Sequence, residues 1–562
     1  MQIPRPEHPR PQFYRDTWQN LNGTWQFEID QSKSGIARGL FKEGVELSGS
    51  ITVPFCPESE LSGVGHKDFL YGVWYKRTVS IPAQAGRVFL HFGAVDYFCR
   101  VYVNGVEAGT HKGGYVSFSF DITELLREGE NEIALYARDD TRSGMIPSGK
   151  QSGKFASYGC FYTRTTGIWQ TVWLEFVPGE YIAGAKYYPN VEDSSVAMAL
   201  ELRGAGELGV EVTYEGRPVG SYRQICAGGE VRFTVPLAEK HLWEVGAGRL
   251  YDVKLTYGQD QVRSYFGLRQ VRLEGQKFLL NGKSVFQRLV LDQGFYPDGI
   301  YTAPTDEALK NDILLSMDMG FNGARLHEKV FEERFLYHAD RLGYLVWGEY
   351  PDWGLDAVRP ENIYAILPEW MEEVNRDFNH PSIIGWCPRN ETTPNQYDDS
   401  VAMTYLVTKA LDPTRPCIDT SGYNHVRTDI YCLHHYQQDP EVFAGYFRNM
   451  TAEGGFDDPY NRKGKFVPGQ PMFYSEYGGI RWSDDPAGWG YGNAPKTREE
   501  FLTRLEGLTD ALLENRHMMG FCYTQLTDVE QEQNGLYTYH REAKFDPALI
   551  RRCFGKKAAI ED

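Results

Sequence analysis

Two glutamates stand out because each follows a short apolar run. Residues 383–387 (IIGWC) lead to Glu391, and residues 472–474 (MFY) lead to Glu476. Such runs are typical of buried parallel strands, and α/β barrels carry their chemistry where these strands end. Two carboxylates at one barrel mouth are what cleavage of a glycosidic bond requires. The pattern therefore predicts a pair of carboxylates that acts on sugars.

A repeating strand–helix pattern from about residue 268 to the C-terminus would position these carboxylates. Thr305 can cap a helix, and Pro368 suits the start of another. Strand and helix alternate about eight times over roughly 290 residues, which is the rhythm of a (β/α)₈ TIM barrel. On this count Glu391 ends the fourth strand and Glu476 the seventh. The predicted strands are 284–291, 322–327, 344–349, 383–387, 417–419, 430–434, 472–476 and 521–526.

The preceding residues have the alternation of β structure. Many short strands between residues 20 and 178, with the hairpin signal Asn104-Gly105, predict a β jelly roll or sandwich. A shorter β region then favours an immunoglobulin-like β-sandwich that acts as a spacer. The predicted domains are a jelly roll (1–178), an immunoglobulin-like sandwich (179–267) and a catalytic TIM barrel (268–562).

Composition narrows the classes of partner. The 562 residues carry a formal net charge of -18, which argues against nucleic acid or an anionic membrane as partner. The 9 cysteines include no C-x-x-C pair, so free thiols in a reducing compartment are favoured over disulfides or zinc. With no apolar leader, no spanning run, no clustered metal ligands and no glycine-rich phosphate loop, we expect a cytoplasmic protein without metal or cofactor.

Several motifs resemble the family-2 glycoside hydrolases, the group of β-galactosidases, β-glucuronidases and β-mannosidases. HPRPQ at 8–12, LNGTWQFEID at 21–30, GVWYKRTVSIP at 72–82, VYVNG at 101–105 and RTTGIWQTVWLE at 164–175 are similar to the family's sugar-binding jelly roll. FGLRQVRLEGQKFLLNGK at 266–283 is similar to the segment that leads into its barrel. NHPSIIGWCPRNE at 379–391 and FYSEYGG at 473–479 resemble its two catalytic motifs.

The resemblance implies an exo-acting hydrolase that retains anomeric configuration through a covalent glycosyl-enzyme. It assigns Glu391 as acid/base and Glu476 as nucleophile. Retaining carboxylates stand about 5–5.5 Å apart, so one can attack carbon while the other protonates the leaving oxygen. At that spacing two charges repel, and we expect Glu391 to hold a proton near neutral pH.

Other residues at strand ends are candidates for substrate binding. Asn390 could hydrogen-bond the sugar 2-OH, or cap backbone at the strand end. Arg325 could keep Glu476 ionised or form a structural salt bridge, and Tyr436 could donate to the nucleophile or simply pack. Trp386 is better explained as core packing because it lies within a strand. Further candidates for hydroxyl contacts or a sugar platform are His327, Glu349, His434, Asp292 and Trp482, with Trp353 and Trp489.

Three departures from the family pattern bear on the sugar. One residue separates Arg325 from His327, whereas the family's β-galactosidases and β-glucuronidases usually have two residues between the corresponding arginine and histidine. Residues 291–296 (LDQGFY) replace a His-rich loop. No Asn-x-Lys, the β-glucuronidase motif that grips the substrate carboxylate, follows Glu476; the triplet at 461–463 precedes it. These departures favour an uncharged sugar over a uronic acid. We expect a β-galactoside or the similarly configured α-L-arabinoside as substrate, with a β-glucuronidase or β-mannosidase of the same family as the alternative.

Two other functions remain open at this level. A catalytically inactive carbohydrate-binding protein could keep the same barrel, although the loss of either glutamate would have favoured it. A glycosyl transferase could use the same covalent intermediate with a sugar acceptor in place of water. The resemblance also implies a possible homo-oligomer, since family members often associate through their β domains.

Overall fold

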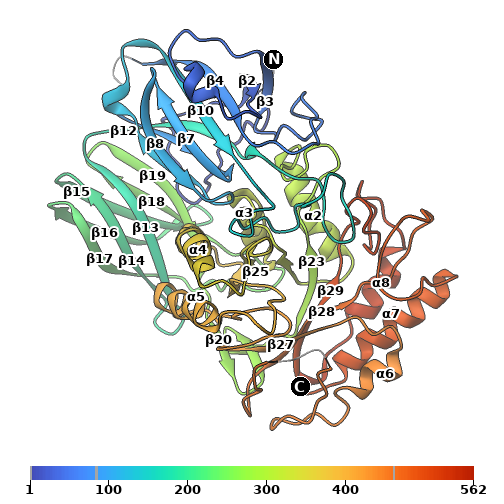
Figure 1. The fold of residues 1–562 in the computed structure, drawn as a ribbon. Helices are drawn as coiled ribbons and strands as arrows, with labels where there is room; N and C mark the ends of the chain where they lie inside the picture. The colour runs from blue at the N-terminus through green and yellow to red at the C-terminus, as the bar shows by residue number, and fades with distance from the viewer. Residues whose placement is uncertain (1–2, 83–85, 460–462, 562) are drawn as a thin grey trace.

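A computed structural model describes residues 3–82, 86–459 and 463–561. Two β units come first in the chain, and an α/β unit follows. In Figure 1 the blue and green β units lie beside one another, and the yellow-to-red α/β unit lies against both. This order of jelly roll, immunoglobulin-like sandwich and barrel is the architecture that the sequence predicts.

Two antiparallel sheets form the first unit, with strand orders β1-β12-β5-β9 and β3-β2-β4-β10-β7-β8. Apolar side chains from both sheets make one buried cluster between them. Asn104 and Gly105 join β7 to β8, and both have positive φ, as the hairpin signal predicts. The elements are β1 (Trp18–Asn20), β2 (Gly23–Ile29), α1 (Gly35–Arg38), β3 (Gly49–Val53), β4 (Val73–Ile81), β5 (Arg87–Phe92), β6 (Val95–Asp96), β7 (Phe98–Val103), β8 (Val106–Lys112), β9 (Phe118–Asp121), η1 (Thr123–Leu125), β10 (Gly129–Arg138), β11 (Gly167–Ile168) and β12 (Val172–Val177).

The second unit is a smaller sandwich of two sheets, β13-β14-β17 and β16-β15-β18-β19. It has an apolar cluster of its own. The domain boundaries after residues 178 and 267 stay predictions; they fall between β12 and β13 and between β19 and β20. The strands are β13 (Tyr181–Asn190), β14 (Ser195–Arg203), β15 (Gly206–Tyr214), β16 (Arg217–Cys226), β17 (Gly229–Pro236), β18 (Tyr251–Tyr257) and β19 (Asp260–Phe266).

A parallel sheet of seven strands, in the order β26-β25-β24-β23-β29-β28-β27, forms the centre of the third unit. Along the chain, β23 is the first strand of this sheet and β29 is the last. The two strands pair with each other, as in a barrel that closes on itself. A small antiparallel sheet precedes it. The strands are β20 (Val271–Glu274), β21 (Lys277–Leu280), β22 (Lys283–Ser284), β23 (Gln287–Asp292), β24 (Gly323–Leu326), β25 (Leu345–Glu349), β26 (Ile383–Cys387), β27 (Tyr431–His435), β28 (Met472–Gly478) and β29 (Met518–Thr524).

The fifth predicted strand, residues 417–419, is the irregular position in the barrel. Cys417 forms one isolated bridge to β26 and no regular ladder to β27. Side chains make the bonds that a ladder would make: Cys417 N donates to Asp429 Oδ2 at 2.9 Å, and Cys432 N donates to His425 Nε2 at 3.3 Å. The segment therefore fills the fifth place in the barrel, between β26 and β27, without being a regular strand.

The helices of the barrel follow the predicted apolar faces with one correction. Thr305 caps α2 by accepting from Ala308 N at 3.2 Å, as predicted. Pro368 does not start a helix: it lies inside α4, and the proline at a helix start is Pro360 in the preceding turn η2. The helices are α2 (Asp306–Asp318), α3 (Glu333–Leu342), η2 (Pro360–Asn362), α4 (Ile363–Asp377), α5 (Asp398–Leu411), α6 (Pro440–Gly445), α7 (Arg498–Leu513), α8 (Pro547–Phe554) and η3 (Ala559–Glu561).

The N-terminal residues tie the three units together through buried ion pairs. Arg5 donates to both oxygens of Glu332 in the barrel, at 3.0 and 2.8 Å. Arg15 contacts Glu175 of β12 at 2.9 Å and Asp260 of β19 at 2.8 Å. Because each arginine and its partners are nearly inaccessible to water, these contacts hold the units in one arrangement.

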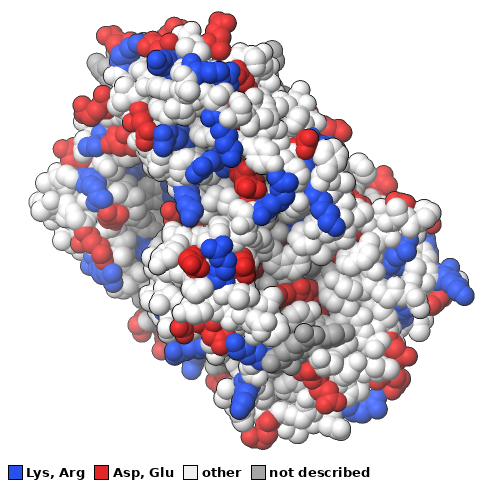
Figure 2. Space-filling model, viewed as in Figure 1, with Lys and Arg blue, Asp and Glu red and all other residues white. Residues whose placement is uncertain are grey.

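Charge is dispersed over the face of the molecule drawn in Figure 2. Lysines and arginines alternate there with aspartates and glutamates, and the excess negative charge does not gather in one region of that face. Among the described residues, no helix combines the length and the apolar character needed to cross a bilayer.

Candidate active site

Glu391 and Glu476 meet at the carboxyl ends of the barrel strands. One carboxylate oxygen of each, and a ring nitrogen of His434, all lie within 4.8 Å of one another. This separation fits a retaining pair at about 5–5.5 Å and is too short for an inverting pair, which stands about 6.5–9.5 Å apart. The side chain of Glu391 is 20% exposed and that of Glu476 is 5% exposed. Glu391 is thus the carboxylate nearer the solvent, where a leaving group would depart.

An unusual backbone conformation presents Glu391. It follows β26 by four residues and has φ +47°, in the left-handed region that non-glycine residues rarely adopt. Its N–H donates to Ser421 O at 2.8 Å, which fixes the turn. Backbone strain of this kind clusters at functional sites because the surrounding structure must hold it.

Glu476 lies within β28 and is held by two donors. Arg325 Nη1 donates to its Oε1 at 3.1 Å, and the Tyr436 hydroxyl donates to its Oε2 at 2.5 Å. Tyr436 in turn stacks on Tyr491. Both carboxylate oxygens of Glu476 are therefore held in place, one by a guanidinium and the other by a hydroxyl.

Arg325 is the centre of this network. Its fork contacts both oxygens of Glu349, through Nε and, at 3.1 Å, through Nη2; Nη2 also donates to Asn390 Oδ1 at 3.1 Å. Burial raises the pKa of Glu349 to about 7, against the opposing effect of Arg325. His327 Nδ1 lies 3.3 Å from Glu349 Oε2, and burial lowers its pKa well below the usual value, so its ring is neutral. Arg325 thus forms buried ion pairs with both Glu349 and Glu476, and a role in keeping Glu476 ionised stays a prediction.

His434 stands between the two glutamates. Its Nδ1 is 2.7 Å from Glu391 Oε1 and 3.4 Å from Glu476 Oε2, and its Nε2 is 2.8 Å from Ser421 Oγ. Burial raises the pKa of Glu391, but the hydrogen bond and charge of His434 outweigh it, so this pKa lies below its ordinary value. The expectation that repulsion keeps a proton on Glu391 is thus wrong for the site without substrate. Contact with His434, and not repulsion by Glu476, therefore sets the direction in which the pKa of Glu391 is shifted.

Asn390 keeps a free donor in the site. Its Oδ1 accepts from Arg325, while its buried Nδ2 has no hydrogen-bond partner among the described residues. An unsatisfied buried amide is costly, and a substrate hydroxyl would satisfy it. This position is consistent with the predicted contact to a sugar 2-OH.

Two predicted residues do not join this network. The indole of Trp482 packs against Phe501 and Phe545, with ring centroids 5.8 and 5.4 Å away, so it belongs to the core around α7. The Asp292 carboxylate accepts from Gly294 N at 2.9 Å within its own loop, and burial raises its pKa to about 7. Sequence alone misplaced both because a strand end or an exposed loop does not specify where the side chain turns.

Three further residues reach the site that sequence reasoning missed. Lys150 comes from the jelly roll, and its charge acts on both Glu391 and Glu476. The Tyr162 hydroxyl donates to Glu532, which lies in the loop after β29. The polar run that follows the last strand could have indicated Glu532. No local signal indicated Lys150, because its domain is distant along the chain.

A metal ion would find donors of suitable type in Glu391, His434 and Glu476. Each donor is already engaged: His434 contacts Glu391, and Glu476 accepts from Arg325 and Tyr436. The guanidinium of Arg325 also places a positive charge where a cation would bind. The absence of a metal requirement stays a prediction.

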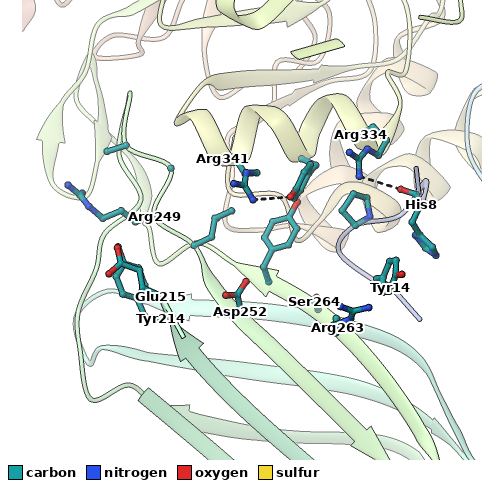
Figure 3. Close-up of a pocket in the computed structure, with 16 residues that line it drawn as sticks. His8, Tyr14, Tyr214, Glu215, Arg249, Asp252, Arg263, Ser264, Arg334 and Arg341 are labelled. Carbon is teal, nitrogen blue, oxygen red and sulfur yellow. Dashed lines mark hydrogen bonds between the residues drawn. The ribbon is translucent and has the colours of Figure 1, made fainter. Parts of the chain in front are cut away.

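A cavity of about 790 Å³ lies elsewhere, between the N-terminal segment, the second sandwich and α3. Figure 3 shows Arg334 beside His8, to whose carbonyl oxygen it donates, with Tyr14 near them and Arg249 on the opposite side of the view. Its arginines are used in local contacts: Arg341 donates to Tyr337 at 2.9 Å, and Arg334 pairs with Asp306. We interpret it as a junction between units.

Comparison with known proteins assigns the family. Two models match the chain: the sugar binding domain of glycosyl hydrolases family 2 over residues 18–174, and the TIM barrel domain of the same family over residues 271–482. The chain belongs to glycoside hydrolase family 2. It is a glycosidase that hydrolyses O-glycosyl bonds, as the paired carboxylates predict.

Relatives of this family 2 glycosidase carry more than one name. The β-glucuronidase of Paenibacillus borealis is 24% identical, over 96% of this chain and 96% of its own length. The β-galactosidase of Thermoanaerobacter pseudethanolicus is 26% identical, over 64% of this chain and 50% of its own length. The solved β-glucuronidase of Ruminococcus gnavus matches 98% of this chain and 100% of its own with a TM-score of 0.80 at 20% identity, which is a likeness of fold.

Proposed function

We propose that this family 2 glycosidase removes terminal sugars from β-glucuronides with retention of configuration. The observation that carries the retaining mechanism is the approach of Glu391 and Glu476 to within 4.8 Å. Support for the sugar comes from the relatives that match nearly the whole chain, such as that of Paenibacillus borealis, which is a β-glucuronidase. The substrate is a carbohydrate in either reading of the sugar.

Each residue has a role in a double displacement. A carboxylate oxygen of Glu476 attacks the anomeric carbon and forms an ester bond, while the bond from that carbon to the aglycone oxygen breaks. Glu391 transfers its proton to that oxygen. It then accepts a proton from water, whose oxygen attacks the same carbon and releases Glu476.

To act as an acid, Glu391 must carry a proton, so its lowered pKa has to rise when substrate binds beside it. The cause of the lowering is the hydrogen bond and charge of His434. An aglycone oxygen that takes the place of His434 beside Glu391 removes this cause, and burial then raises the pKa. Arg325 and Tyr436 stay on Glu476 and hold the leaving carboxylate in the second step.

This proposal replaces the preference for a β-galactoside or α-L-arabinoside. That preference rested on the lack of an Asn-x-Lys motif after Glu476, whereas several relatives that match most of the chain are β-glucuronidases. Asn461 and Arg462 of the earlier triplet lie outside the described residues. A β-galactoside remains the second candidate, favoured by that missing motif and by the relative from Thermoanaerobacter pseudethanolicus.

Release of nitrophenol from a panel of nitrophenyl glycosides tests this proposal. The panel holds the β-glucuronide, β-galacturonide, β-galactoside, β-glucoside, β-mannoside and α-L-arabinopyranoside, each with wild type and Glu476→Gln. We expect the β-glucuronide to be cleaved fastest. The Glu476→Gln variant should lose at least about 10⁴-fold in kcat, because the amide of glutamine cannot form the ester bond of the glycosyl-enzyme. Preference for the β-galactoside would establish the second candidate. Folded wild-type protein that cleaves none would favour a binding protein.

A further inference from the structure

Lys150 is a buried lysine whose ammonium lacks a hydrogen-bonding or anionic partner among the described residues. Lys150 is only 5% exposed, yet its ammonium forms no hydrogen bond or ion pair with any residue that the structure describes. Its one close contact is with the ring of Trp353, whose centroid is 3.6 Å from Nζ. The other buried lysines of the described chain are satisfied: Lys76 donates to Lys42 O and Val45 O, and Lys329 to Tyr301 O.

The loop that carries Lys150 is fixed to the barrel on one side by Trp353. This jelly-roll loop comprises residues 139–166, between β10 and β11. Ser148 N and Gly149 N both donate to Trp353 O, at 2.7 and 3.1 Å. Gly149 has φ +53°, and a Cβ there would lie 2.3 Å from Glu328 O, so the two backbones are in direct contact. The position of Lys150 is therefore set by the barrel.

Contacts on the other side fix the loop to the segment after β29. The Tyr162 hydroxyl donates to Glu532, and Gln531 Nε2 donates to Gly159 O at 2.7 Å and Phe161 O at 3.1 Å. Tyr162 N also donates to Lys150 O at 2.7 Å. The jelly-roll loop thus forms a wall of the site, fixed at two edges, with Lys150 between them.

Lys150 faces the candidate catalytic residues. Trp353, which its ammonium covers, donates through Nε1 to Asn390 O at 3.2 Å, and Asn390 precedes Glu391. Burial lowers the pKa of Lys150, but Cys160 and the carboxylates of Glu532, Glu328 and Glu476 raise it above its ordinary value, so Lys150 is a cation at neutral pH. None of these three carboxylates has an oxygen within 4.0 Å of Lys150 Nζ, the distance that defines an ion pair. The cation is therefore available to a ligand.

We propose that Lys150 binds the carboxylate of a hexuronide in the candidate active site. This assignment rests on the proposed function and deepens it, because it names the residue that would select an anionic sugar. It also accounts for the lack of an Asn-x-Lys motif after Glu476: the cation comes from the jelly roll and not from the barrel. A buried ammonium without an anionic partner gains most from a ligand of opposite charge that also accepts hydrogen bonds.

A purely structural role fits the contacts less well. A lysine that balanced the charge of Glu328 or Glu532 would gain by approaching one of them, and the flexible lysine side chain could do so. The tight clamp on both edges of its loop would then be unnecessary. The alternative predicts that loss of Lys150 harms all glycosides equally.

The experiment compares Lys150→Gln, Lys150→Arg and Lys154→Gln with wild type. Lys154 is the matched control: it lies in the same loop, 3.8 Å from the ring of Tyr158, but is exposed. The substrates are nitrophenyl β-glucuronide, its uncharged glucuronamide and the β-glucoside. For Lys150→Gln we expect kcat/KM on the glucuronide to fall by about 100-fold or more beyond any fall on the two neutral sugars. Lys150→Arg should restore part of the loss, and Lys154→Gln should match wild type.

Binding of D-glucuronate and D-glucose to Glu476→Gln, with and without Lys150→Gln, separates this inference from the proposed function. The assignment is supported if the double variant binds glucuronate more weakly than Glu476→Gln does but binds glucose equally well. Equal losses on all substrates, or unchanged binding and turnover of the glucuronide, would overturn it. Wild type that cleaves neutral glycosides and neither binds nor cleaves uronides would overturn the proposed function and the role of Lys150 together. Uronide cleavage that does not depend on Lys150 would overturn the role of Lys150 alone.

Discussion

The two candidate catalytic glutamates differ in their surroundings more than in their position. Glu476 is nearly inaccessible and accepts from Arg325 and Tyr436, whereas Glu391 is nearer the solvent and contacts His434. Environment of this kind divides the roles of two carboxylates, since one must stay ionised and the other must exchange protons. Sequence motif and local contacts thus point to the same assignment.

Replacement of Glu391 by glutamine should depend on the leaving group. A general acid matters most when the departing oxygen is strongly basic, so kcat/KM should fall by about 10²- to 10⁴-fold for an alkyl glycoside. A dinitrophenyl glycoside needs little protonation and should lose much less in the first step. Rates for a series of aglycones of rising pKa measure this slope. An equal loss across the series would contradict the role of Glu391 as acid, and Glu476→Gln is the control that should lose activity on all of them.

Glu58 should make the molecule less stable as pH rises. It is fully buried, and burial raises its pKa to about 7 from 4.5. The unfolded chain releases this proton first, so the stabilisation is complete below pH 4.5 and is lost as pH approaches 7. In Glu58→Gln this decline should be smaller, and at pH 8 the variant should gain up to about 3 kcal/mol relative to wild type. Unfolding measured from pH 4.5 to 8 tests it, with exposed Glu60→Gln as control; parallel curves for Glu58→Gln and wild type would refute it.

At the scale of elements, the jelly-roll loop is the part of the site that comes from outside the barrel. The loop is long and polar, but it has backbone contacts on both edges. Such contacts turn a loop into a rigid wall, and a displacement of about 1 Å in a site can lower a rate about 100-fold. The geometry at Gly149 is where this wall is most sensitive.

Gly149→Ala should move the loop without changing any charged residue. The added Cβ would lie 2.3 Å from Glu328 O, at a φ of +53° that alanine disfavours. We expect kcat/KM on the preferred glycoside to fall by about 10-fold or more, with a lower melting temperature. Gly153→Ala is the control in the same loop, because its Cβ would meet only Arg142 Cγ at 3.9 Å. Unchanged kinetics in Gly149→Ala would show that the loop does not shape the site.

At the scale of the whole molecule, the N-terminal segment joins all three units. Arg15 is 3% exposed and lies between Glu175 of the jelly roll and Asp260 of the second sandwich. Removal of one member of a buried ion pair leaves an uncompensated charge, which is more harmful than loss of the contact itself. The arrangement that brings the jelly-roll loop to the barrel depends on contacts of this type.

Arg15→Gln should therefore lower the free energy of unfolding by about 3–5 kcal/mol. Arg263→Gln is the control at the same junction, since its pair with Asp16 is exposed on both sides and should contribute less than about 1 kcal/mol. Denaturant unfolding of both variants measures the difference. Similar stability for the two variants would contradict the assigned importance of the buried pair.

Much of the fold was predictable because it rests on local patterns. The period of apolar residues, the hairpin turn at Asn104-Gly105 and the cap at Thr305 each act over a few residues, and the structure confirms them. Pro368 and the irregular segment at 417–419 were mispredicted, since tertiary contacts there override local preference. The ends of β26 and β28 likewise placed Glu391 and Glu476 together, because all the parallel strands of a barrel bring their carboxyl ends to one mouth.

The sequence by itself thus determined the class of reaction, the barrel and the two candidate catalytic carboxylates of this protein. Tertiary structure decided which strand-end side chains join the site, that His434 rather than repulsion controls Glu391, and that Trp482 lies in the core. It also brought Lys150 to the site from a domain more than a hundred residues away along the chain. The physical reason is that periodicity is local, whereas the direction of a side chain and the pKa of a buried group depend on neighbours that only the folded chain supplies.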